Sequence, residues 1–273
     1  MASNTTKKFL IFLQLLHRDF YIFFKNFTTH AINNGLIFPL MYAFFFAYIQ
    51  SQLYFETDML QERTIMFIGN ISLLTLVSSY HFTFPLLFDF EGARHVDYEI
   101  RTLSPRLVIL EKIVFATLAT FALILPFFPF CKLLLQNKFD TSNTNWIQLF
   151  IILFLGSLCV SAYYFLAICI LKNASRINNF WLRFNLPLLL LGGFWTPWYI
   201  TMKVFPALGI ATLANPFLYI TEGARQTIVG GSKFLSFPVS VTALICFSLL
   251  FTMLTFYFLK NELIIFNQNG CIP

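Results

Sequence analysis

The sequence predicts an all-α integral membrane protein that forms a single domain over residues 1–273. Hydrophobic residues make up 58% of the chain and charged residues only 11%. Uncharged runs long enough to cross a bilayer recur along its whole length. The net charge of +6 is, in such a chain, more typical of Lys and Arg retained on the cytoplasmic side of a membrane than of nucleic-acid binding.

Residues 1–30 predict a helix that lies in the membrane interface. Apolar side chains recur on one face at three- and four-residue spacing, at Phe9, Phe12, Leu13, Leu16, Phe20, Phe23 and Phe24. The helix also carries the cations that we expect to face lipid phosphates, Lys7, Lys8, Arg18 and Lys25. The alternative is the start of a crossing helix, and His17 and Asp19 argue against it because charge is costly in the bilayer.

Six crossing helices are predicted, each able to supply most of the roughly 20 apolar residues that a crossing needs. They are Ile32–Leu53, Ile65–Phe88, Ile113–Cys131, Trp146–Leu171, Phe184–Trp198 and Phe234–Leu259. Four helix-breaking residues interrupt the fifth, Pro187, Gly192, Gly193 and Pro197. Such residues are tolerated in a membrane where neighbouring groups satisfy the freed backbone.

An even number of crossings puts both termini on the same side. With the termini in the cytoplasm, twelve of the 18 Lys and Arg residues are cytoplasmic and the rest, Arg225 among them, lie outside. This distribution follows the positive-inside rule. We therefore expect a multi-pass protein of the cytoplasmic (inner) membrane with both termini inside the cell.

Residues 203–233 predict a re-entrant hairpin on the outer side. The apolar run here is broken too often for a seventh crossing, at Pro206, Gly209 and Pro216, and a seventh crossing would also send the C-terminus outside. Asn215 followed by Pro216 is a typical helix start, with Asn as the cap. Glu222 and Arg225 are three residues apart, which predicts an ion pair at or just below the outer surface.

Residues 86–112, between the second and third crossings, are crowded with charge. The charged or titratable residues here are Asp89, Glu91, Arg94, His95, Asp97, Glu99, Arg101 and Arg106. A charge at the bilayer centre costs roughly 2.5–3.5 kcal/mol or more, so the segment lies in water. We expect a short amphipathic helix with an apolar ridge at Val96, Ile100 and Leu103 that docks a soluble partner.

An acidic loop that holds magnesium, as in some membrane transferases, is the alternative for this segment. The interleaved Arg94, Arg101 and Arg106, and the lack of a second acidic loop, argue against it. The chain has no Gly-x-x-x-x-Gly-Lys-Ser/Thr phosphate loop, its four His are isolated and its five Cys are scattered. We therefore expect no catalytic residue, no metal site and no cofactor in this chain.

Two stretches resemble the membrane subunits of ABC exporters of the type-2 permease family. Phe88-Asp-Phe-Glu-Gly-Ala-Arg…Tyr98-Glu-Ile-Arg-Thr-Leu-Ser-Pro-Arg106 is similar to the family's coupling-helix region. The second stretch resembles its Gly-aromatic-Pro segment followed by Asn-Pro-x-x-Tyr-x-x-Glu-x-x-Arg. Here that motif reads Gly192-Gly-Phe-Trp-Thr-Pro197 with Asn215, Pro216, Tyr219, Glu222 and Arg225. Phe90 and Val96 depart from the polar residues expected in the first stretch.

The resemblance implies a non-enzymatic permease within an ATP-driven exporter. Its partners would be two copies of a cytosolic ATPase subunit, which binds the ATP and Mg²⁺, and a second permease copy. The cluster from Asp89 to Arg106 would dock the ATPase, and Asn215 to Arg225 would form the outer gate. The substrate would be an amphiphile such as a lipid, a lipid-linked glycan or a hydrophobic drug. The alternatives are a polysaccharide or teichoic-acid export channel of the same family, or a membrane prenyl or lipid transferase.

Overall fold

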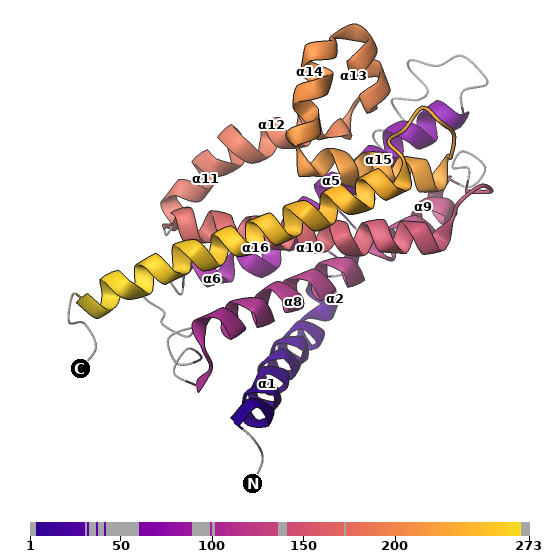
Figure 1. Cartoon of the computed structure of the whole chain (residues 1–273). Helices are drawn as coiled ribbons and strands as arrows, with labels where there is room; N and C mark the ends of the chain where they lie inside the picture. Colours follow the sequence, from indigo (N-terminus) through magenta and orange to yellow (C-terminus); the bar gives the residue numbers. More distant parts are fainter. Residues whose placement is uncertain are drawn as a thin grey trace.

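The computed structural model describes residues 4–30, 32, 37, 41, 60–88, 99, 102–135, 141–171 and 173–268. All regular structure in these ranges is helical (Figure 1). The N-terminal helices are α1 (Asn4–Lys25) and α2 (Phe27–His30). The long helices that follow are α5 (Leu60–Thr83) with its short extension α6 (Pro85–Phe88), α8 (Pro105–Ile124) with α9 (Phe127–Leu135), α10 (Trp146–Leu171) and α16 (Phe237–Gln268).

Within the described ranges, four helical stretches are long and apolar enough to cross a membrane. They are Thr64–Leu87, Pro105–Pro129, Trp146–Leu171 and Phe237–Leu259, and they correspond to the predicted second, third, fourth and sixth crossings. The predicted first crossing, Ile32–Leu53, lies outside the described residues except at Ile32, Ile37 and Met41. Helix α1 is not among the four.

The predicted fifth crossing, Phe184–Trp198, is wrong in its extent. Its helical part comprises α11 (Ile177–Phe180), the π-helix η6 (Trp181–Asn185), α12 (Leu186–Leu189) and the π-helix η7 (Leu190–Phe194). The helix stops at Gly193, whose φ of 79° is left-handed. The apolar stretch that remains, Trp181–Phe194, is shorter than a full crossing requires.

A compact hairpin follows this break and leads into α15 (Pro216–Ile228). It consists of α13 (Trp198–Val204), α14 (Pro206–Ala211) and the single 3-10 turn η8 (Thr212–Ala214), and it lies at the top of Figure 1. The hairpin thus begins at Trp198, before the predicted boundary at residue 203. As predicted, Asn215 caps α15 by accepting a hydrogen bond from the Phe217 N–H, at 3.1 Å, with Pro216 in the first turn.

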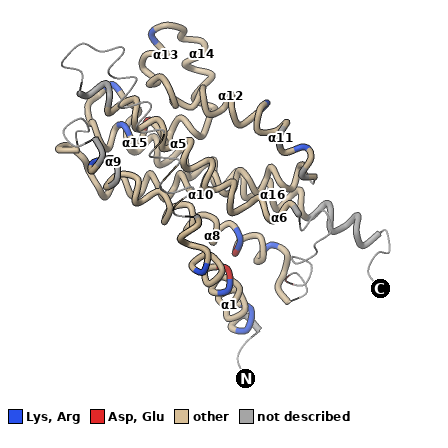
Figure 2. The backbone as a smooth tube through the Cα atoms, turned by 180° about the vertical axis from the view of Figure 1, so that it is seen from behind, with Lys and Arg blue, Asp and Glu red and all other residues tan. Residues whose placement is uncertain are grey.

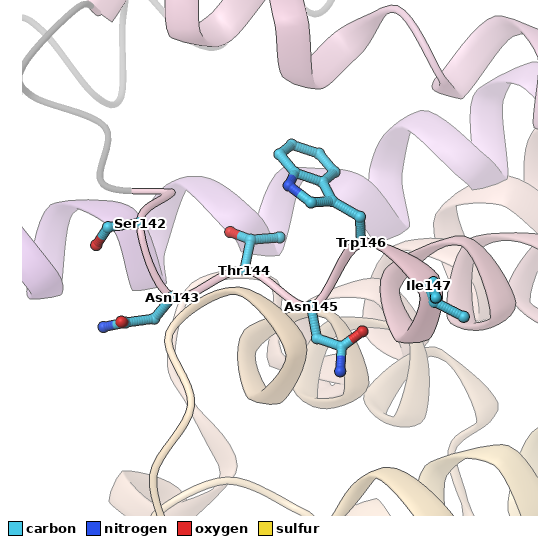
Figure 3. Close-up of a pocket in the computed structure, with 6 residues that line it drawn as sticks. All are labelled: Ser142, Asn143, Thr144, Asn145, Trp146 and Ile147. Atoms are coloured by element: carbon cyan, nitrogen blue, oxygen red, sulfur yellow. The ribbon is translucent and has the colours of Figure 1, made fainter.

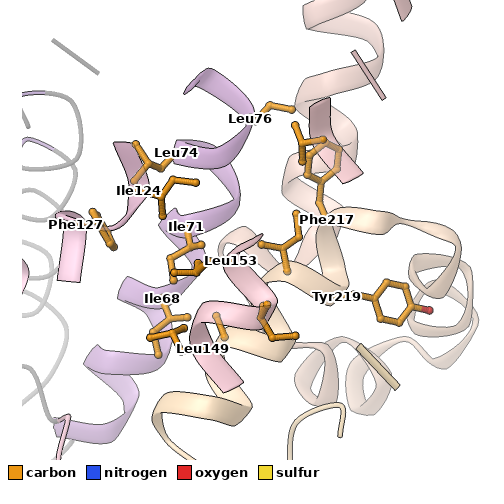
Figure 4. Packing of buried hydrophobic residues seen from close by; sticks show 14 of the residues in the cluster. Ile68, Ile71, Leu74, Leu76, Ile124, Phe127, Leu149, Leu153, Phe217 and Tyr219 are labelled. Atoms are coloured by element: carbon orange, nitrogen blue, oxygen red, sulfur yellow. The ribbon is translucent and has the colours of Figure 1, made fainter. Parts of the chain in front are cut away.

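Helix α10 lies at the centre of the bundle and packs against α16, α8, α15 and α5. The largest apolar cluster joins these helices through residues such as Ile71 of α5, Leu153 of α10 and Phe217 of α15 (Figure 4). Helix α16 is covered least: 22% of its apolar window is buried, against 61–67% for the other three spans. Its outer face is therefore left for lipid or for another chain.

Helices α5, α10 and α16 run in one direction and α8 runs in the opposite direction, so their ends gather at two opposite ends of the bundle (Figure 1). The end on the left of the figure holds α6, the start of α8 and the end of α10. These segments share an apolar cluster that includes Leu87, Leu103, Val108 and Ile168. The start of α8 belongs to this packed end, so Glu111 and Lys112 are helical residues and not part of a loop.

Candidate functional site

Helix α1 docks on α8 through aromatic side chains. The Phe20 ring lies 5.3 Å from that of Phe115, and the Phe23 ring lies 5.4 Å from that of Phe82 on α5. Edge-to-face contacts of this kind add roughly 0.5–1.5 kcal/mol each to the burial of the rings. Three of the seven residues of the predicted apolar stripe remain exposed on α1: Phe9, Leu13 and Phe24. Helix α1 therefore presents apolar side chains both to α8 and away from it.

Beside these rings is a charged junction, formed by Arg18, Asp19, Glu99, Glu111 and Lys112. Arg18 of α1 donates to Asp19 at 2.7 Å and also to Glu99. Lys112 of α8 donates to Asp19 at 2.6 Å and lies 3.3 Å from Glu99 Oε2. The junction therefore joins α1, α8 and the segment that connects α6 to α8.

Arg18 is the most exposed member of the junction, with 46% of its side chain accessible. Burial of the remainder disfavours its charged form, but hydrogen bonds to Glu99 and Asp19 outweigh this and raise the pKa of the guanidinium. Its strongest contacts are thus within the chain, whereas we predicted that it faces lipid phosphates. The other predicted interfacial cations, Lys7, Lys8 and Lys25, are exposed.

Glu99 was predicted to face a soluble partner, and here the structure differs. Its residue is 7% exposed and its carboxylate accepts from Arg18 and Lys112. A buried carboxylate with two cationic partners in the same chain cannot also serve as a surface contact. Arg106 is exposed at the start of α8. The other predicted docking residues lie outside the described residues: Asp89, Glu91, Arg94, His95, Asp97 and Arg101.

At the other end of the bundle, a hairpin lock is formed by Gly193, Trp198, Glu222 and Arg225. The predicted ion pair is present, with Arg225 Nη1 2.8 Å from Glu222 Oε1, and both side chains are 0% exposed. Arg225 also donates to the backbone carbonyls of Ile65, at 3.0 Å, and Gly193, at 2.6 Å. Glu222 Oε1 accepts from the Trp198 N–H at 3.0 Å. One ion pair thus holds together α5, the broken fifth helix and the hairpin.

Further hydrogen bonds fix the hairpin to α15. Thr221 donates to the Gly192 carbonyl at 2.7 Å, the Trp198 indole N–H donates to the Gly209 carbonyl at 2.9 Å, and the Tyr219 hydroxyl donates to the Leu213 carbonyl at 2.7 Å. All three acceptors are backbone carbonyls, one at the helix break and two in the hairpin. In the hydrocarbon region such groups must be satisfied by protein, and the motif residues do this.

Two buried polar features were not predicted. Tyr163 donates to Asn185 Oδ1 at 2.7 Å, and Asn185 Nδ2 donates to the Tyr164 hydroxyl at 3.2 Å. The other is the junction of Glu111 and Lys112 with α1. In both cases the signal in the sequence is a polar residue inside an apolar run, and such a residue usually bonds to a neighbouring helix.

The described residues offer little to bind a metal or a small ligand. Among them, no three His, Cys, Asp or Glu side chains are grouped as a metal site would require. A hollow lined by Ser142 to Ile147 opens at the start of α10 (Figure 3). Its lining comes from six consecutive residues and includes hydroxyl and amide groups but no charged side chain.

Comparison of the chain with protein-family models, with characterised proteins and with solved structures finds no match. The arrangement of charge is therefore the best guide to function. Lys and Arg lie on α1 and toward helix ends, while the long middle stretches of α5, α10 and α16 carry none (Figure 2). Arg225, in the last turn of α15, differs from most of these cations because it is fully buried, in the hairpin lock.

Proposed function

We propose that the chain is the membrane subunit of an ATP-driven ABC exporter of the type-2 permease family. It would move an amphiphilic substrate, such as a lipid, a lipid-linked glycan or a hydrophobic drug, outward across the cytoplasmic membrane. The observation that carries this proposal is the pairing of Glu99 with Arg18 and Lys112. It ties the charged connecting segment to two helices of the membrane body, so that a force on the segment would move both helices.

The proposed energy source is a separate cytosolic ATPase subunit, present in two copies. The exposed Arg106 and the charged residues from Asp89 to Arg101 would contact it, while Glu99 would anchor the segment from within. A second copy of the chain would complete the transport path. The largely uncovered face of α16 is consistent with contact to that copy or to lipid.

The hairpin lock would serve as the outer gate in this proposal. It combines a helix break, a short hairpin and a buried ion pair within one unit. The gate would open when the pair separates, a costly step because a buried charge is strongly destabilised when its partner is withdrawn. Export of a polysaccharide or a teichoic acid through the same gate is the second candidate within the family.

A pull-down of the co-expressed ATPase subunit tests the proposal. Reversing two charges of the connecting segment, with Arg94→Glu and Arg101→Glu together, is expected to reduce the ATPase recovered on the order of 10-fold or more, because like charges would then face each other. Lys203→Glu is the matched control, since this exposed cation lies in the hairpin. Equal recovery with the double variant and with the control would refute the docking assignment.

The rival from another class, a membrane transferase, makes a different prediction. The purified chain alone would then transfer a prenyl or lipid group in the presence of magnesium, and Asp89→Asn with Asp97→Asn would abolish the reaction. We expect no turnover by the chain alone. Magnesium-dependent turnover that needs these two carboxylates would replace the permease proposal.

A further inference from the structure

The carboxyl group of Glu111 has no hydrogen-bond partner. The residue is 0% exposed, and neither Oε1 nor Oε2 accepts or donates a hydrogen bond. Its closest charged group is the Nζ of the adjacent Lys112, 3.3 Å from Oε2. The flanking Ile109 and Ile113 belong to an apolar cluster. A buried carboxylate without hydrogen bonds is disfavoured, and buried groups of this kind commonly neutralise instead.

Among the described residues, the charged junction has one more acid than it has cations. Asp19, Glu99 and Glu111 supply three carboxyl groups, whereas Arg18 and Lys112 supply two cations. Arg does not deprotonate in proteins, and Lys112 is held as a cation by Asp19 at 2.6 Å and Glu99 at 3.3 Å. With every acid ionised, the junction would carry an uncompensated negative charge in a largely buried place.

The hydrogen bonds identify which acid is in excess. Asp19 accepts from Arg18 at 2.7 Å and from Lys112 at 2.6 Å, and Glu99 accepts from the same two cations. Both acids are thus engaged in charge-assisted hydrogen bonds with two cations. Glu111 receives none. Glu111 is therefore the acid whose protonation costs the least free energy. Its protonation also removes the excess negative charge.

The neighbouring helices do not alter this balance. The charged groups that act on Glu111 are Lys112 on its own helix, Asp19 on α1 and Glu99 in the connecting segment. On α5, the titratable side chain that packs against the apolar cluster of Ile109 and Ile113 is Tyr80, a neutral phenol.

We propose that Glu111 is a proton-binding site, and that its carboxyl group holds a proton while α1 is docked on α8. Loss of this proton would leave the junction with one excess negative charge, which is relieved when α1 separates and water reaches the carboxylate. Proton release and undocking of α1 are therefore linked, and raising the pH favours the undocked state. The inference does not use the proposed function, and its test needs no ATPase.

Infrared difference spectroscopy on the full chain in detergent micelles tests the proton directly. At about neutral pH, the spectrum of the wild type minus that of Glu111→Gln is expected to contain the carbonyl stretch of one protonated carboxyl group. Glutamine is the appropriate replacement because it matches a neutral glutamic acid in size. A carboxylate band in that difference spectrum, with no protonated carbonyl stretch, would overturn the proposal.

Amide hydrogen exchange of α1, corrected for its intrinsic pH dependence, tests the linkage. Between about pH 6 and pH 9, a range that buried glutamates reach, exchange in the wild type is expected to increase several-fold. Glu111→Gln should remain protected throughout, whereas Glu99→Gln should exchange faster at every pH because it loses the acceptor of Arg18 and Lys112. The same pH response in Glu111→Gln as in the wild type would contradict the linkage.

Discussion

Arg225→Met is expected to destabilise the chain by about 3–5 kcal/mol, the cost of removing one partner of a buried ion pair. Both members of the pair are fully buried, so the variant leaves the Glu222 carboxyl group without its cationic partner. It also removes the donor to the Ile65 and Gly193 carbonyls. Thermal unfolding of the purified chain in detergent, followed by tryptophan fluorescence, measures the effect.

Two further variants separate the pair from its surroundings. Combining Arg225→Met with Glu222→Gln leaves no buried charge, so the double variant is expected to be more stable than Arg225→Met alone. Arg183→Met removes an exposed arginine from the fifth helix and should change the melting temperature little. If the double variant unfolds as readily as the single one, the ion pair is not what holds the hairpin lock together.

Gly69→Ala is expected to destabilise the chain by about 3 kcal/mol or more, although alanine is the better helix former. A Cβ at position 69 of α5 would overlap the Phe194 carbonyl oxygen and lie 2.9 Å from Arg225 Nη2. The backbone of the broken helix rests directly on α5 at this point. The substitution therefore forces the two elements apart and disturbs the hairpin lock.

Gly156→Ala is the matched control within a helix. A Cβ there would meet only the side chain of Ile220, at 3.2 Å from Cγ1, which can shift by a few tenths of an ångström. We expect a change in stability of less than about 1.5 kcal/mol, because the strain offsets the gain in helix propensity. The difference between the melting temperatures of the two variants measures the cost of a Cβ at position 69, where α5 lies against the Phe194 backbone. Equal effects of the two substitutions would contradict this close approach.

Hydrophobic run length was enough to predict the long helices. Trp146–Leu171 was predicted with the boundaries that the structure has, because charge or turn residues end the run on both sides. The predicted third crossing begins at Ile113, later than α8, because Glu111 and Lys112 were expected to lie in water. Lys112 is accommodated within the helix by Asp19 of α1, with Glu111 beside it, and the length of an apolar run cannot show a partner far away in the chain.

Local spacing also predicted part of the hairpin lock. The cap at Asn215 and the pairing of Glu222 with Arg225 depend on residues two or three apart, so the sequence contains them. The burial of the ion pair, however, also involves the backbone carbonyls of Ile65 and Gly193, to which Arg225 donates. These two residues are distant from Arg225 in the sequence. The same limitation applies to Glu99, whose position next to other charges suggested a surface residue, although its partners are at positions 18 and 112.

The orientation of the bundle is the claim on which the account depends, because it places the charged connecting segment in the cytosol. Asn143 and Asn173 flank α10 on either side and both are exposed. In a variant without the five native cysteines, Asn143→Cys should react with a membrane-impermeant thiol reagent applied to intact cells. Asn173→Cys should react only after the membrane is permeabilised. Labelling of Asn173→Cys but not Asn143→Cys in intact cells would place the segment outside and contradict the account.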